Sequence, residues 1–153
     1  TIAHEAAACG HADVLKWILS VAQLGGDLLT RPARSGATIA HVAALSNCVD
    51  VLGWIAIAPT LVSALLKAAR CDGRSIAHEA AAAGHTTILN WILDANDLGS
   101  GLLKRQANDG STIALTAARN GHTDVLRWVA NMSMLGVALL AKVRNDGWTI
   151  AHE

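Results

Sequence analysis

The chain repeats itself every 37 residues, without an insertion or a deletion. Its units begin at Thr1, Thr38, Ser75, Thr112 and Thr149 and open with the related runs TIAHEAAACGH, TIAHVAALSNC, SIAHEAAAAGH, TIALTAARNGH and TIAHE. A fixed period of about 20–50 residues is typical of stacked arrays in which each unit contacts only its neighbours. We therefore expect one elongated repeat domain over residues 1–153. Its units are 1–37, 38–74, 75–111 and 112–148, followed by a partial unit at 149–153.

Each unit predicts two helices at its start. The opening Thr or Ser can accept hydrogen bonds from free N–H groups of the first turn, which predicts a helix N-cap. The alanine-rich helix that follows ends at Gly10, Gly84 and Gly121, or at Asn47, residue types that tolerate a positive φ. A second helix, opened by an Asp or Thr such as Asp13, carries one apolar stripe.

Each stripe contains one tryptophan, and these indoles are predicted to be core residues in preference to a stacking platform for bases or sugars. The four positions are Trp17, Trp54, Trp91 and Trp128. A third element follows, in which leucines recur at i, i+4 and i+5 and predict a short helix. They are Leu24, Leu28, Leu29; Leu61, Leu65, Leu66; Leu98, Leu102, Leu103; and Leu135, Leu139, Leu140. The adjacent Gly25 and Gly26 favour a loop in the first unit.

The unit closes with a polar turn at 34–36, 71–73, 108–110 and 145–147, three of the four being Asp-Gly turns. The repeat unit reads NDGSTIALTAARNGHTDVLRWV at 108–129 and CDGRSIAHEAAAAGHTTILNWI at 71–92. It resembles an ankyrin repeat, whose pattern is D-x-x-G-x-T-P-L-H-x-A-A-x-x-G-H-x-x-V-V-x-x-L-L. It departs from that pattern at Ile39 and Ala40, at the stripe tryptophans, and by about four extra residues. The resemblance implies an all-α, ankyrin-like α-solenoid of 37-residue repeats, here with a third short helix and a shortened turn in each unit.

A row of histidines is the strongest candidate for chemistry, and we interpret it as structural. His4, His41, His78 and His152 share one position, which Leu115 takes in the fourth unit. The resemblance implies that this histidine hydrogen-bonds the capping Thr and the neighbouring turn. Metal ligands must converge within about 2 Å of one ion, which histidines one repeat apart do not do.

A second row has the same structural interpretation: His11, His85 and His122, with Cys48 as the exception. His4-Glu5 and His78-Glu79 begin like the zinc-protease motif H-E-x-x-H, but the second histidine comes seven residues later and beyond a glycine. The acidic residues Asp72, Asp109 and Asp146 are explained by turn chemistry. We therefore expect a protein that is not an enzyme and that needs no cofactor or metal.

Composition limits the partners. Twelve basic and twelve acidic side chains cancel, and no basic stripe points to nucleic acid. No apolar run reaches the roughly 20 residues of a membrane span, and no small-molecule ligand is evident. Three cysteines without a CxxC spacing favour a reducing compartment and hence a cytoplasmic location, including delivery into a host cytoplasm, although an extracellular assembly stays open.

The function we expect is a non-catalytic protein–protein interaction scaffold. Two alternatives are a structural repeat protein that packs further copies of itself into a fibre, tube or coat, and the repeat stalk of a larger toxin or effector. In ankyrin-like arrays the binding surface consists of turn tips and outer positions of the first helices. Mapped onto this chain, the candidate partner-binding residues are Arg34, Ala37, Val42, Leu45, Arg74, Glu79, Ser111, Thr116, Arg119 and Trp148.

The apolar pattern continues to both ends of the chain. Ile2 and Ala6 near the start, and Leu139 and Leu140 near the end, keep the pattern of interior units, whereas terminal repeats of solenoids need a polar outer face. We therefore expect residues 1–153 to be an excerpt of a longer array.

Overall fold

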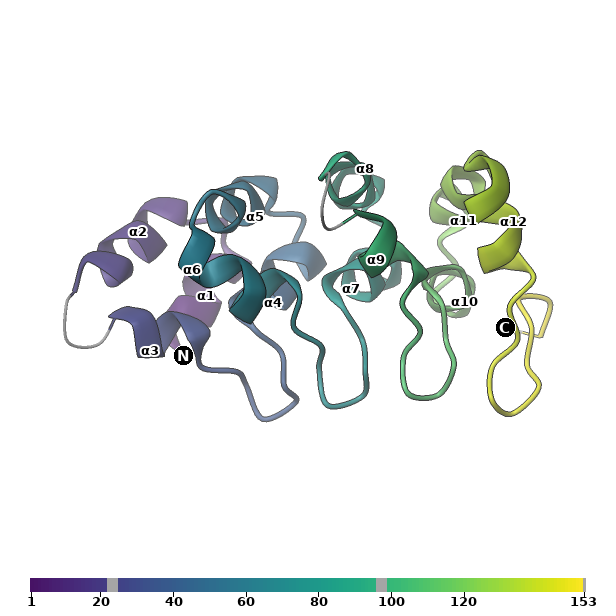
Figure 1. Cartoon of the computed structure of the whole chain (residues 1–153), viewed down its shortest axis with the longest axis horizontal. Coiled ribbons are helices and arrows are strands. Elements are labelled where there is room, and N and C mark those ends of the chain that lie inside the picture. Colours follow the sequence, from purple (N-terminus) through teal and green to yellow (C-terminus); the bar gives the residue numbers. More distant parts are fainter. Residues whose placement is uncertain (22–24, 96–98, 153) are drawn as a thin grey trace.

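Helices account for all the regular secondary structure that the computed structural model describes, at residues 1–21, 25–95 and 99–152. Figure 1 shows them as four groups side by side along the long axis, with the chain ends at opposite ends of the row. The first helices are α1 (Ile2–Ala8), α4 (Ile39–Leu45), α7 (Ile76–Ala82) and α10 (Ile113–Arg119). The second helices are α2 (Ala12–Ser20), α5 (Val49–Ala56), α8 (Thr86–Asp94) and α11 (Thr123–Ala130). The third helices are α3 (Gly25–Thr30), α6 (Pro59–Leu61) continued by η1 (Val62–Leu66), α9 (Gly99–Lys104) and α12 (Ser133–Leu140).

The first helices begin and end where the sequence predicts. Thr112 Oγ1 accepts a hydrogen bond from Leu115 N at 3.3 Å, and Thr38 and Ser75 form capping boxes with the histidine three residues later. Positive φ values follow each helix, including 60° at Asn47. The small alanine side chains are buried and let α1, α4, α7 and α10 pack directly against one another. The N-caps and the glycine or asparagine ends are confirmed.

The second helices begin slightly earlier than predicted. Asp13 lies in the first turn of α2, and the N-cap residue is His11, whose side chain makes no capping bond. Cys48, His85 and His122 precede the other second helices in the same way. An Asp in the first turn still stabilises the helix, because its charge lies near the positive end of the helix dipole.

The prediction that the stripe tryptophans form a core ladder is correct for one indole and wrong for another. Trp54 is 8% exposed, Trp91 and Trp128 are half-buried, and Trp17 is 64% exposed. Trp128 Nε1 donates a hydrogen bond to Asn90 Oδ1 in the preceding second helix at 2.6 Å. Adjacent second helices pack together in this way, but no helix within the described residues lies against the open side of α2. Trp17 therefore stays exposed.

The third helix is present in each of the four complete units, and the prediction of a loop at Gly25 and Gly26 is wrong. Gly25 is buried, and a Cβ placed on it would lie 2.3 Å from the carbonyl oxygen of Ile18. Gly99 and Gly136 occupy the same position in later units. A Cβ placed on either would lie similarly close to the carbonyl oxygen of Ile92 or Val129. These glycines allow the third helix to pack against the end of the second. Leu24 and Leu98 lie outside the described residues.

The second unit shows what happens without this glycine. Val62 stands at the position of Gly25, and its Cβ excludes the same close approach. The segment instead forms one turn of α6 and then winds as the π-helix η1, in which Lys67 N donates to Val62 O at 3.3 Å. The wider π-turn still buries Leu65 and Leu66.

Candidate functional site

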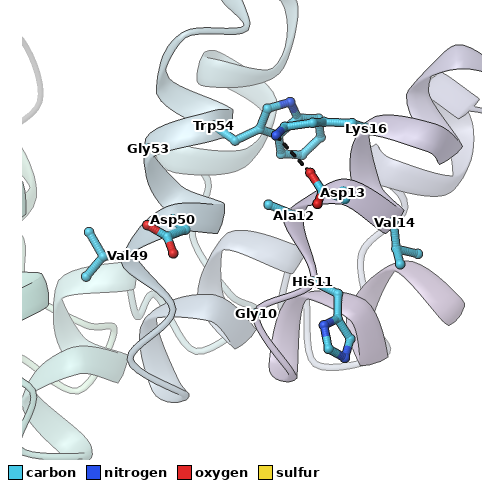
Figure 2. A pocket seen from close by; sticks show the side chains of 10 residues that line it. All are labelled: Gly10, His11, Ala12, Asp13, Val14, Lys16, Val49, Asp50, Gly53 and Trp54. Carbon is cyan, nitrogen blue, oxygen red and sulfur yellow. Dashed lines mark hydrogen bonds and ion pairs between the residues drawn. The ribbon is translucent and has the colours of Figure 1, made fainter.

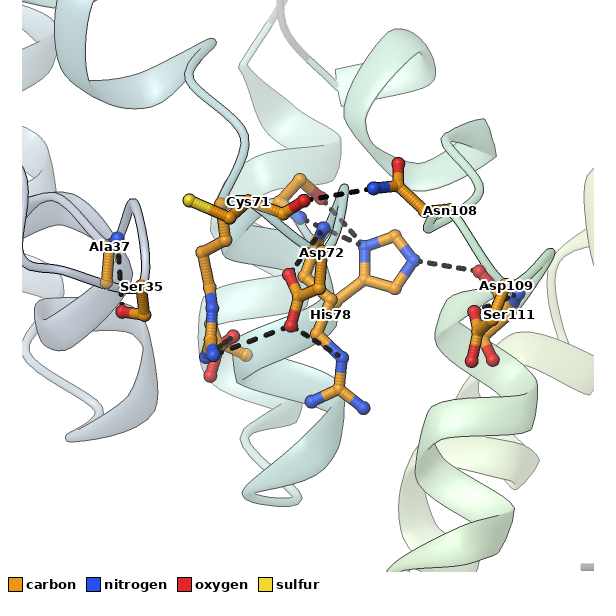
Figure 3. Close-up of polar contacts among 12 residues, drawn as sticks. Ser35, Ala37, Cys71, Asp72, His78, Asn108, Asp109 and Ser111 are labelled. Atoms are coloured by element: carbon orange, nitrogen blue, oxygen red, sulfur yellow. Dashed lines mark hydrogen bonds and ion pairs between the residues drawn. The ribbon is translucent and has the colours of Figure 1, made fainter.

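The four turns lie on one side of the row, and hydrogen bonds link them into a ladder (Figure 1). Gly36, Gly73, Gly110 and Gly147 take φ values of 78–88°, as the turn pattern predicts. The backbone N–H of each turn tip donates to the preceding turn: Cys71 to Ser35, Asn108 to Asp72 and Asn145 to Asp109, at 2.9–3.0 Å. Asn108 adds a side-chain bond of 3.0 Å to the Cys71 carbonyl of the preceding turn (Figure 3), and Asn145 adds one of 3.0 Å to the Asn108 carbonyl. The ladder fixes the spacing of the turns.

The aspartates of these turns have structural roles, as predicted. Asp72 Oδ1 accepts from the backbone N–H of Arg74 at 3.1 Å, and Asp109 Oδ1 accepts from Ser111 at 2.9 Å. Burial acts to raise the pKa of Asp109, but hydrogen bonds from the Ser111 backbone and hydroxyl, together with Arg144 and Arg119, lower it on balance. This carboxylate is held ionised, which is the state that a turn acceptor needs.

The first histidine row joins α1, α4 and α7 to the turns that follow them. Nδ1 of His41 lies 2.9 Å from Thr38 Oγ1, and that of His78 lies 3.0 Å from Ser75 Oγ. Nε2 lies 3.3 Å from the Arg74 carbonyl oxygen in His41 and 3.1 Å from that of Ser111 in His78. A carbonyl can only accept, so Nε2 carries the proton, and Nδ1 accepts from the backbone N–H of the cap residue at 3.3 Å. The bonding that the resemblance implied is confirmed for His4, His41 and His78, whereas the bonds given for His152 join it to the cap residue Thr149.

Burial favours the neutral form of these rings. Desolvation lowers the pKa of His41 and of His78 from 6.5 to about 4, against the opposing effect of the bonded carbonyl. Neutral rings with both nitrogens in hydrogen bonds serve as structural bridges, because neither nitrogen is left to transfer a proton or to bind a metal.

The second histidine row points the other way along the array. Nε2 of His85 donates to the Leu45 carbonyl of the preceding unit at 3.0 Å, and Nε2 of His122 donates to that of Ala82 at 2.8 Å. Cys48 Sγ makes a longer contact of 3.7 Å to Ala8 O at the same position. The sequence predicted a structural role for this row without finding its acceptor. The acceptor lies 40 residues earlier, and no local pattern marks it.

A buried ion pair lies where a partner contact was expected. Arg70 Nη1 lies 2.7 Å from Glu79 Oε1, and Arg70 Nη2 lies 3.4 Å from Asp72 Oδ2. Glu79 is only 4% exposed, and its carboxylate pairs with Arg70. Ser111 and Thr116, also expected to meet a partner, are buried as well. The structure therefore removes Glu79, Ser111 and Thr116 from the surface available to a partner.

The remaining candidates do reach the surface on the side of the turns. Leu45 is 47% and Trp148 45% exposed, Arg34 and Arg119 are exposed, and Ala37, Val42 and Arg74 are half-buried. A pocket of about 280 Å³ lies among them, lined by Asp72, Arg74, Ala107, Asn108, Asp109 and Arg119. We call the four turns and the C-terminal ends of the first helices the turn face.

Trp148 has neighbours that hold its ring in place. The Arg144 guanidinium carbon lies 5.9 Å from the indole centroid, and the His152 ring centroid also lies 5.9 Å away. Arg144 Nη2 pairs with Asp146 at 2.9 Å, which holds the guanidinium over the face of the indole. A pre-ordered, partly exposed aromatic loses little conformational entropy when it is bound.

A larger pocket lies elsewhere, between the first turns of α2 and α5 (Figure 2). Its volume is about 640 Å³, and Gly53 opens it, since no side chain stands where the next two units carry Asn90 and Arg127. Lys16 Nζ pairs with Asp13 at 3.1 Å, and both side chains are largely exposed.

Two further properties of the described residues bear on ligands. Across residues 1–21, 25–95 and 99–152, no three His, Cys, Asp or Glu side chains are grouped so that they could hold a metal ion. In the same part of the chain, no individual helix is both long and apolar enough to cross a bilayer. Compared with protein-family models and with curated proteins, the chain matches none.

Proposed function

We propose that the chain is an ankyrin-like solenoid with a shortened turn that acts as a non-catalytic scaffold and binds a protein partner on its turn face. The observation that supports this most directly is the rigid ladder of turns, which holds the exposed side chains of the face at fixed spacing. Small, pre-ordered contacts repeated along a row suit an extended protein surface better than a single small ligand.

The chemistry of the turn face favours a partner with both apolar and polar contacts. Leu45 and Trp148 offer exposed apolar area, while Arg34, Arg74 and Arg119 offer guanidinium groups. Arg and Trp are enriched among the residues that dominate binding energy at protein interfaces. The aspartates of the turns balance the positive charge, so the face as a whole is close to neutral. The three free cysteines fit a reducing, cytoplasmic location.

The test is a selection of binders from a displayed library of random peptides, followed by mapping with variants of this chain. The selected peptides should lose about ten-fold or more in affinity with Leu45→Asp and with Trp148→Ala, since both remove exposed anchors. Val14→Asp is the matched control, because Val14 is an exposed apolar residue on α2, away from the turns. Peptides that are insensitive to both turn-face variants, or equally sensitive to the control, would contradict the proposal.

A further inference from the structure

An exposed apolar side chain and an apolar pocket occur on the same edge of the array, two units apart. Ile57 follows α5 directly and is 79% exposed, more than any other large apolar side chain in the described residues. The pocket has a volume of about 400 Å³ and lies at the end of α11. It is lined by Leu93, Trp128, Asn131, Met132, Ser133 and Leu135.

The repeat places both features on one side. Asn131 occupies the position in the fourth unit that Ile57 occupies in the second, and each immediately follows its second helix. Ile57 and the pocket therefore face the same way, at the edge formed by the C-terminal ends of the second helices. The turn face, with Leu45 at the end of a first helix, is a separate surface.

Uncharged residues flank Ile57 in the chain, and uncharged side chains line the pocket. No charged residue occurs from 51 to 66 around Ile57, or from 128 to 141 around the pocket. The exposed neighbours of Ile57 are small or apolar, among them Ala56, Pro59 and Ala64. Leu93 lies at the pocket and is 44% exposed. Contacts between these uncharged side chains remove little polar surface from water, although the exposed carboxylate of Asp94 adjoins Leu93 at the pocket.

We propose that this edge binds a second copy of the same chain, with Ile57 of each copy inserted into the pocket of the other. A two-fold pair satisfies this arrangement, because in such an interface residue i contacts residue j while j contacts i. The second copy is the occupant because each chain carries both the apolar projection Ile57 and an uncharged hollow on the same edge. Each contact also raises the effective concentration of the other.

In the unit between the two features, a charged residue that the structure describes occupies the position of Ile57 and Asn131. Asp94 takes the same position in the third unit and is exposed. In the two-fold pair the two Asp94 carboxylates lie near the axis and repel each other. Asp94→Asn therefore strengthens the pair, a result that an unrelated apolar contact would not give.

The test is the association state of the chain by sedimentation equilibrium over a concentration series. The native chain should show a monomer–dimer equilibrium, and Ile57→Asp and Leu93→Lys should each weaken it about ten-fold or more. An equimolar mixture of these two variants should associate again. The mixed pair keeps one native contact, and in the other contact the introduced carboxylate of one variant lies beside the introduced ammonium of the other.

Leu45→Asp is the matched control, since it introduces the same charge at an exposed leucine of the turn face and should leave the dimer unchanged. Thermal unfolding followed by circular dichroism verifies that each variant is folded. A native chain that is monomeric throughout the series would overturn the proposal. So would a monomer that sediments with phosphatidylcholine vesicles and loses this binding in Ile57→Asp. The proposal does not rest on the function of the turn face, because Leu45→Asp and Ile57→Asp test the two surfaces separately.

Discussion

The third and fourth units close the same turn in two ways. In the third unit His78 bonds both the cap residue Ser75 and the carbonyl of Ser111, whereas in the fourth unit Leu115 fills the corresponding space with an apolar side chain. Both side chains are buried. In the fourth unit the Trp148 carbonyl keeps the backbone bond from Arg144 but gains no imidazole. Volume alone is therefore enough to pack this position, and the polar bridge adds a directional link that a leucine cannot supply.

Low pH should give the largest difference in stability between units with a buried histidine and the unit with Leu115. The pKa of His41 and of His78 falls to about 4 in the folded chain, against 6.5 in the unfolded chain, so the unfolded state takes up protons first. The stability from the neutral rings is complete above about pH 6.5 and is lost as the pH falls through 4. Each histidine should then cost about 3 kcal/mol. Urea unfolding at a series of pH values measures the free energy of unfolding. If this free energy depends on pH as steeply in His78→Leu as in the native chain, the prediction is wrong.

Removal of the bridge should have the next largest effect. His78→Ala leaves the Ser111 carbonyl without its imidazole donor and opens a cavity, so we expect a loss of about 1–3 kcal/mol at neutral pH. His78→Leu copies the fourth unit and should cost less than the alanine variant, because it keeps the volume. Urea unfolding of both variants compares the two contributions. Equal losses would show that packing at this position contributes nothing.

The converse substitution should give a small gain. Leu115→His places an imidazole between Thr112 and the carbonyl of Trp148, which correspond to Ser75 and Ser111 of the third unit. We expect about 0.5–1.5 kcal/mol of added stability at pH 7.5, the usual net value of a hydrogen bond. Leu115→Met serves as the control, since it keeps the volume without adding a donor. A destabilised Leu115→His variant would mean that the fourth unit is shaped for leucine.

Zinc should have no effect on either unit. The imidazoles of His41 and His78 use both nitrogens in hydrogen bonds, so a metal would have to break these bonds without finding a second nearby ligand. Differential scanning fluorimetry with zinc and then with a chelator should give one Tm. A concentration-dependent rise that His41→Ala abolishes would show that the row binds metal.

Features that depend on one unit were readable from the sequence. Thr112 as a cap and Asn47 at positive φ follow from local backbone chemistry, which the period displays several times. The prediction for Gly25 is wrong because its role depends on more than local backbone chemistry. Its helix propensity is poor, but the quantity that decides its role is the distance to the Ile18 carbonyl, which belongs to another helix.

The candidate site was less predictable, because burial there depends on neighbouring units. The sequence predicts an exposed Glu79, but this residue is buried and pairs with Arg70, nine residues earlier. Trp17 shares the stripe of Trp54, yet only Trp54 has a second helix packed on its open side. When the contacts of a side chain come from the adjacent unit, its own residue type does not determine whether it is exposed.

The two histidine rows also bear on how the chain folds. Their bonds to backbone carbonyls join residues only 33 or 40 positions apart, one row to the following turn and the other to the preceding unit. The entropy cost of closing a loop grows with its length, and contacts between distant residues slow the search for the native state. Here the loops closed by these bonds keep the same length however many units precede them. Each unit can therefore dock as soon as its neighbour is in place, at a rate that the length of the array does not limit.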